Sequence, residues 1–66
     1  MTIGESIRKI RKERGYSRER LARKLGTHHT TIVHWEWDIS YPRLNTLIQL
    51  ADFFDVSLDE LVGRRM

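Results

Sequence analysis

The sequence contains no cysteine, which excludes a disulfide framework and any metal site built on thiolates. It also lacks a long apolar run, so we expect neither a membrane span nor a secretory signal. We therefore expect the protein in the reducing cytoplasm. With 66 residues the chain has room for one domain, covering 1–66, with one small core and little space for an enclosed active site. Its stability must therefore come from packing and from well-capped helix ends.

The net charge is a modest +3, but the charges are unevenly distributed. Residues 1–24 hold nine Lys or Arg against three Glu, a net charge of +6, whereas residues 25–66 hold three Arg against six Asp or Glu, a net charge of −3. A basic half beside an acidic half suggests an oriented contact with a polyanion. The alternative is an ordinary solvated surface of mixed charge.

Two helices are predicted in the basic half. Thr2 and Glu5 have the spacing of a capping box, and apolar residues then recur at helical spacing up to a glycine, namely Ile3, Ile7, Ile10 and Gly15. These signals predict a helix at about 3–14. Ser17 is a good N-cap for a second helix at about 18–25, which Gly26 ends. The apolar face of that helix consists of Leu21, Ala22 and Leu25.

A third helix is predicted at about 29–37, because only Thr27 and His28 separate Gly26 from the next periodic segment. At about 100° per residue, its residues divide into two faces. One face carries Ile32, Trp35 and Glu36, and the other carries Thr30, Val33, His34 and Trp37. The first set is expected to face the core and the second to face outwards.

The remaining chain predicts a loop and two more helices. Pro42 favours a loop at residues 38–42, because the residue before a proline is pushed out of the helical region. A fourth helix at about 43–54 is expected to supply much of the core through Leu44, Leu47, Ile48, Leu50, Ala51 and Phe54. Ser57 and Glu60 form a second capping box, ahead of a short fifth helix that Gly63 closes. The fold class is therefore all-α, a compact five-helix bundle with a helix-turn-helix unit at 17–37.

Motifs along nearly the whole chain carry a resemblance to a known family. They are Ile7-x-x-Ile10-Arg11, Leu21-Ala22-x-x-Leu25-Gly26, Ile32-x-x-Trp35-Glu36, Pro42, Leu50-Ala51 and Val56-Ser57-Leu58-x-x-Leu61. With them the sequence resembles the repressor/Cro-type (lambda-repressor-like, XRE-like) helix-turn-helix family of bacterial and phage regulators. The resemblance implies that the third helix enters the major groove of double-stranded DNA. It also implies a structural ion pair between Arg11 and Glu36.

The expected DNA contacts follow from the outer face of the third helix and from the resemblance. The expected base-reading residues are His29, Thr30, Val33, His34 and Trp37. Histidine and threonine can donate to or accept from base edges, and the Val33 or Thr30 methyl groups can pack on a thymine methyl. Helix N-termini favour phosphate, and the expected phosphate-contacting residues lie near them and in the turn and loop: Ser17, Arg18, Thr27, His28, Tyr41 and Arg43. Arg18 takes a place usually held by glutamine.

Besides Arg18, four residues depart from the family pattern: His28, Val33, Asp38 and Arg43. Asp38 replaces the glycine that normally ends the third helix, and a left-handed conformation costs a non-glycine residue about 1 kcal/mol, although aspartate tolerates it well. Both a natural repressor with an unusual operator and an engineered domain with a rewritten groove face would depart in this way. A homodimer on two half-sites is expected in the first case, with Phe53 and the fifth helix as candidate contacts, and a monomer in the second.

Two other functions are alternatives to DNA binding. The first is a protein-interaction module, such as an antitoxin-like or co-regulator domain, that uses an exposed apolar patch of Val33, Trp37, Ile39 and Tyr41. The second is an enzyme or metal site, which we do not expect, because His29 and His34 are about 140° apart on a helix and no acidic residue lies one turn from His34 on that face. We expect no cofactor, metal or small-molecule substrate.

Overall fold

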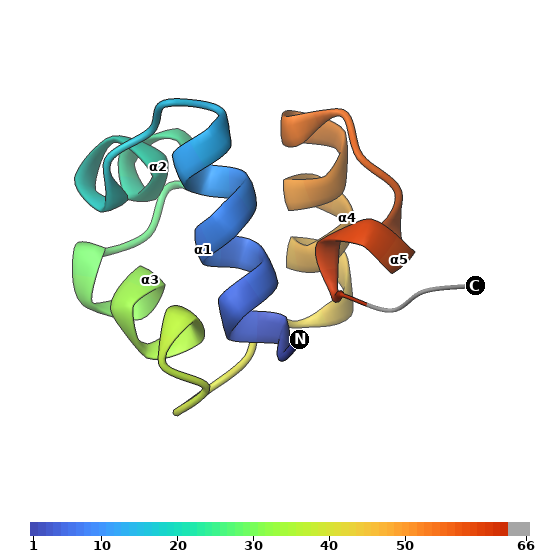
Figure 1. Cartoon of the computed structure of the whole chain (residues 1–66). Coiled ribbons are helices and arrows are strands. Elements are labelled where there is room, and N and C mark those ends of the chain that lie inside the picture. The colour runs from blue at the N-terminus through green and yellow to red at the C-terminus, as the bar shows by residue number, and fades with distance from the viewer. Residues whose placement is uncertain (64–66) are drawn as a thin grey trace.

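The computed structural model describes residues 1–63, which form five helices and no strand. These are α1 (Ile3–Glu13), α2 (Arg18–Leu25), α3 (His29–Glu36), α4 (Leu44–Phe54) and α5 (Leu58–Leu61). The all-α five-helix fold is thus confirmed, with α1 between the pair α2 and α3 and the pair α4 and α5 (Figure 1). Arg14, Trp37 and Arg43, which were expected inside helices, are cap residues instead. Across residues 1–63, no helix combines the length and apolarity that crossing a membrane requires.

At the starts of α1, α2 and α5, side chains satisfy the first backbone N–H groups. The hydroxyl of Thr2 accepts a hydrogen bond from the Glu5 N–H (3.1 Å), and the Glu5 carboxylate accepts one from the Thr2 N–H (3.0 Å). The bond from the Thr2 N–H, with a smaller contribution from the Thr2 hydroxyl, lowers the pKa of the Glu5 carboxyl group. Ser17 accepts from the N–H of Arg20 at the start of α2, and Ser57 accepts from that of Glu60 at the start of α5. At α5 the bond from the Glu60 N–H to the Ser57 hydroxyl is one of the two hydrogen bonds that the predicted capping box requires.

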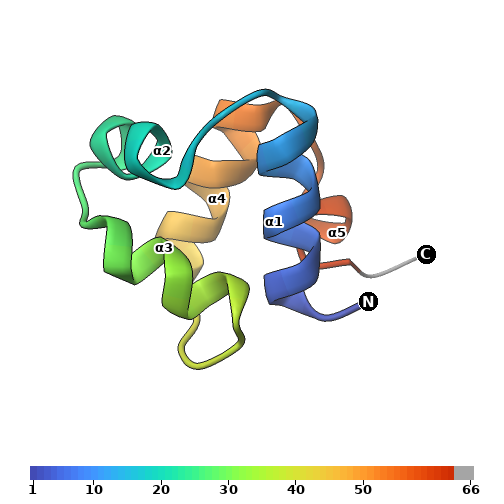
Figure 2. The ribbon, with the colours of Figure 1, turned by 60° about the vertical axis from the view of Figure 1, so that its left-hand side comes forward.

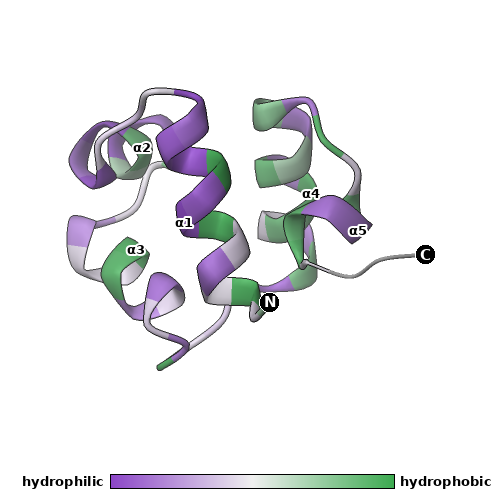
Figure 3. Ribbon diagram, in the orientation of Figure 1, coloured by the Kyte–Doolittle hydropathy of each residue, from purple (hydrophilic) through white to green (hydrophobic). Residues whose placement is uncertain are grey.

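One core joins all five helices. Its buried side chains are Ile7, Ile10, Leu21, Ala22, Ile32, Trp35, Leu50, Ala51, Phe54 and Leu61. Helix α1 packs against both α3 and α5, which places it at the centre of the molecule. Figure 3 shows that α2 is largely hydrophilic, whereas α4 is largely hydrophobic. Helix α4 supplies three of these ten core residues, and α2 presents most of its polar residues to solvent.

The expectation that the whole apolar stripe of α4 is buried is wrong at two residues. Leu44 is 67% exposed and Ile48 is 44% exposed, whereas Leu50, Ala51 and Phe54 are buried. Measured around the helix axis from Leu50, Phe54 lies at about 40°, but Leu44 and Ile48 lie at about 120° and 160°. The apolar residues of α4 thus occupy two faces, and the core of so short a chain covers only one of them.

Helix α1 begins directly against the end of α3. Gly4 is buried, and a Cβ atom added to it would overlap the carbonyl oxygen of Trp35 and lie 2.7 Å from that of Glu36. Backbone therefore meets backbone at this contact, and a side chain of any size would separate the two helices.

Replacing Gly4 with alanine is expected to reduce the free energy of unfolding by about 1–3 kcal/mol, because the carbonyl groups of α3 have no room to move. Urea denaturation measures the change. In open space the same substitution inside a helix would instead stabilise the protein, by up to about 1 kcal/mol. Arg8→Ala, on the exposed face of α1, is the matched control and should stay within about 0.5 kcal/mol of the parent chain. A Gly4→Ala variant as stable as this control would contradict the close contact.

Candidate nucleic-acid interface

Helices α2 and α3 form a pair joined by the short turn 26–28. Gly26 ends α2 in the left-handed conformation, with φ 70°, and the next residue, Thr27, donates its N–H to the carbonyl of Ala22 (2.9 Å). The chain can reverse within three residues because glycine adopts this conformation without strain. Figure 2 shows the two helices at one side of the molecule, with the turn at its edge. This is the helix-turn-helix arrangement that the sequence predicts for 17–37.

The two faces of α3 have different environments. Ile32, Trp35 and Glu36 are buried against the core, as their helical spacing predicts. The five expected base-reading residues lie on the other side. His29, Thr30 and Trp37 are exposed, and Val33 and His34 are half-buried. The structure thus gathers these five side chains on the uncovered face of α3, and their contact with bases stays a prediction.

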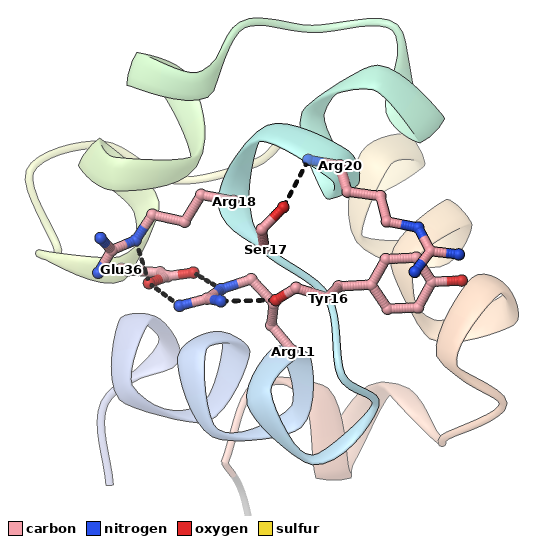
Figure 4. A network of polar contacts seen from close by, with 6 residues as sticks. All are labelled: Arg11, Tyr16, Ser17, Arg18, Arg20 and Glu36. Atoms are coloured by element: carbon pink, nitrogen blue, oxygen red, sulfur yellow. Dashed lines mark hydrogen bonds and ion pairs between the residues drawn. The ribbon is translucent and has the colours of Figure 1, made fainter.

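Glu36 is the centre of a polar network beneath this face (Figure 4). Its side chain is fully buried, and the Arg11 guanidinium binds it through two hydrogen bonds, Nε to Oε2 (2.6 Å) and Nη2 to Oε1 (3.2 Å). The third nitrogen of Arg11 donates to the backbone carbonyl of Tyr16 (2.7 Å). The pair that the family resemblance implied is therefore present, and it joins α1 to the last turn of α3.

A second arginine shares the same carboxylate, which the sequence alone did not predict. Arg18 donates its Nε–H to Oε1 of Glu36 (2.9 Å), and its side chain remains 31% exposed. The available signal was the departure at position 18, since a guanidinium reaches farther and offers more donors than the usual glutamine. Arg18, at the start of α2, therefore has a structural contact with Glu36, while part of its side chain stays accessible at the surface.

The other expected phosphate-contacting residues lie at helix starts and in loops. The hydroxyl of Ser17 caps α2, Thr27 is half-buried, and His28, Tyr41 and Arg43 are exposed. His28 and Arg43 are the N-cap residues of α3 and α4, and neither side chain makes a capping hydrogen bond. At the start of α3 the backbone N–H groups thus have no side-chain cap, which suits a phosphate oxygen.

An apolar patch borders the interface where the chain leaves α3. Trp37 is 68% exposed and Tyr41 is 54% exposed, with Ile39 exposed between them and Leu44 following. A solvent-facing patch of this kind marks a contact with another molecule more often than chance. Within residues 1–63, no three histidine, aspartate or glutamate side chains are grouped closely enough to hold a metal ion.

Comparisons with known proteins agree with this architecture. The HTH_3 family model, described as "Helix-turn-helix", matches residues 7–61. The chain is 30% identical to the HTH-type transcriptional regulator ImmR of Bacillus subtilis (strain 168), covering 97% of this chain and 50% of that protein. It is 32% identical to the HTH-type transcriptional activator BcrR of Enterococcus faecalis, covering 96% of this chain and 31% of that protein. The chain therefore spans half or less of the length of these two relatives.

A solved structure resembles the chain over its full length. The P22 c2 repressor, in a crystal structure with a synthetic operator, superposes with a TM-score of 0.88 at 26% identity and covers 98% of both chains. All five helices thus have counterparts in a protein solved in complex with an operator.

Replacing Glu36 with glutamine is expected to lower the free energy of unfolding by about 3–5 kcal/mol, because two guanidinium groups then lose their only buried negative charge. A decrease of that size approaches the whole stability of a domain of this length. Thermal and urea denaturation measure it. Glu19→Gln, which makes the same change at an exposed position of α2, should leave the stability almost unchanged. Equal stability of the two variants would contradict the role assigned to Glu36.

Proposed function

The chain belongs to the helix-turn-helix family whose model matches its residues 7–61, and we propose that residues 1–66 are the sequence-specific DNA-binding domain of a transcriptional regulator. The partner is double-stranded DNA, and the site of action is the nucleoid in the cytoplasm. The main supporting observation is the uncovered face of α3, whose opposite face is fixed to the core by Ile32, Trp35 and Glu36. A rigid helix with one open polar face is suited to the major groove.

The proposed base contacts use the chemistry of the outer face of α3. His29, Thr30 and His34 each offer a donor or an acceptor to base edges. Val33 and the Thr30 methyl group pack on the 5-methyl group of thymine, so that the target contains A·T pairs. Trp37, at the exit of α3, contacts the outer part of the site. Since α3 has eight residues, it reaches only a few base pairs.

The proposed phosphate contacts flank α3 on both sides. Arg18 and the start of α2 bind one stretch of backbone, with Thr27 and His28 in the turn, and Tyr41 and Arg43 bind another. The charge distribution supports this orientation, because the net charge of residues 1–24 is +6. Phosphate contacts position a protein on DNA without reading its sequence.

The exposed apolar patch does not favour a protein-interaction module over DNA binding, because Trp37 and Tyr41 border the same face of α3. We propose instead that a second copy of the chain binds beside the first on a two-fold symmetric site. The exposed side chains of Leu44 and Ile48 offer an apolar surface for contact between the two copies. No catalytic role is proposed, since helix-turn-helix regulators act by binding.

Selection from a pool of randomised duplexes at moderate salt is expected to enrich one motif of a few base pairs. Thr30→Ala and His34→Ala should lose this enrichment, because they remove donors and acceptors at the groove. Gln49→Ala, at an exposed position of α4, is the control and should retain it. A palindromic motif would support a dimer. Weak binding without enrichment would leave only a basic surface, and no binding at all would favour a protein partner.

Salt dependence is expected to reveal the phosphate contacts. If four to six phosphates are bound, log K should fall against log salt with a slope of about −4 to −5. Arg18→Gln should make this slope shallower by about 1, because one charged contact is lost. Lys24→Gln, at an exposed position near the end of α2, should change it less. A flat response would contradict DNA binding, and an unchanged slope for Arg18→Gln would contradict the role of Arg18.

A further inference from the structure

The chain leaves α3 through a closed turn that contains an aspartate where glycine is the usual residue. Asp38 has φ 57°, its N–H donates to the carbonyl of Trp35 (3.1 Å), and the N–H of Ile39 donates to that of His34 (2.9 Å). This pair of bonds is the Schellman arrangement, which requires a left-handed residue at position 38. Glycine would adopt it without strain, so the backbone conformation alone does not explain why an aspartate is present.

The Asp38 side chain binds the start of α1. Its Oδ2 accepts a hydrogen bond from the Thr2 hydroxyl (2.7 Å), and its Oδ1 accepts one from the Gly4 N–H (2.9 Å). These two bonds, with a smaller contribution from Tyr41, lower the pKa of the carboxyl group. We call the contacts of Asp38 with Thr2 and Gly4 the α1–α3 clasp. It joins residues 36 and 34 positions apart in the sequence.

A second aspartate in the same chain shows that the left-handed turn does not itself require the clasp. Asp55 ends α4 with φ 56° and with the equivalent backbone bond, from the Val56 N–H to the Ala51 carbonyl (3.0 Å). Among the hydrogen bonds of residues 1–63, none involves the Asp55 side chain. The two aspartates therefore share a backbone conformation, and only Asp38 connects its turn to another helix.

The clasp lies between two exposed parts of the proposed interface. Trp37 precedes Asp38, Tyr41 follows three residues later, and both side chains are more than half exposed. Helix α1 is a rigid reference for them, because Ile7 is fully buried and Gly4 is in backbone contact with α3. The clasp thus adds two side-chain hydrogen bonds to those that the turn after α3 makes within its own backbone.

We propose, on the premise that α3 enters DNA, that Asp38 is a positioning residue for the interface. Its carboxylate holds the exit of α3 against the start of α1 and so fixes Trp37 and Tyr41 in the orientation that meets DNA. The conformational entropy of these two side chains is then already lost in the free protein, so that binding DNA does not require the loss again. Asp38 itself makes no contact with DNA.

The test compares DNA affinity, base-pair discrimination and salt slope among variants that keep the left-handed turn. Asp38→Gly removes the clasp and also the backbone strain. It should bind the selected duplex about tenfold more weakly, discriminate less at the base pairs nearest Trp37, and keep the parent salt slope. Asp38→Asn, which favours the same conformation and keeps one acceptor oxygen, should restore most of the affinity. Asp55→Gly removes the same strain elsewhere and should bind as the parent chain does.

If the Asp38→Gly variant binds DNA with the affinity and the base-pair discrimination of the parent chain, the proposal is overturned, even if the variant has a lower free energy of unfolding. If Asp38→Gly does not stay folded at the assay temperature, Thr2→Val and Thr2→Ser give the same comparison, because only serine keeps the hydroxyl. Weaker DNA binding by the valine variant supports the clasp, and equal binding by the two overturns it. Failure of the proposed function gives a different result, because the parent chain itself would then bind no duplex. The positioning role of Asp38 would be rejected in that case as well.

Discussion

Glu36 lies in the last turn of α3 and accepts hydrogen bonds from Arg11 of α1 and Arg18 at the start of α2. One buried carboxylate thus fixes three helices relative to each other, and the cost of leaving it or either arginine unpaired keeps them together. Because the network lies on the inner side of α3, it helps to fix which face of that helix is turned to solvent. The orientation of the proposed DNA-binding face therefore depends on where this charge is buried.

The same network contributes to the positive charge of the N-terminal part of the chain. Two guanidinium groups share one carboxylate, so a positive charge is left over beside the start of α2. The uncapped start of α3 adds backbone donors next to it. Both features suit the phosphate backbone of DNA, and in the proposed complex the uncovered side chains of α3 are available to read bases. Stability and the proposed recognition thus use opposite faces of one helix.

Local signals predicted the helices well, because a capping residue or a left-handed glycine acts within a few positions. Thr2, Ser17 and Gly26 each mark a helix end that the structure contains. Contacts between distant segments were harder to predict. The exposure of Leu44 and Ile48, the sharing of Glu36 by Arg18, and the bonds of Asp38 all depend on how helices far apart in sequence meet. The base-reading residues could be placed on a face, but their contacts depend on a DNA sequence that the chain does not contain.

In the proposed complex, the outer face of α3 meets DNA while its inner face stays fixed to the core. Titration of the isotope-labelled chain with its selected duplex, followed by amide NMR shifts, detects which residues meet the duplex. The largest shifts should lie at the start of α2, in residues 27–37 and in the loop at 41–43, with the amides of α5 unchanged. Shifts confined to α5 and the exposed stripe of Leu44 and Ile48, with α3 unaffected, would contradict the proposed complex.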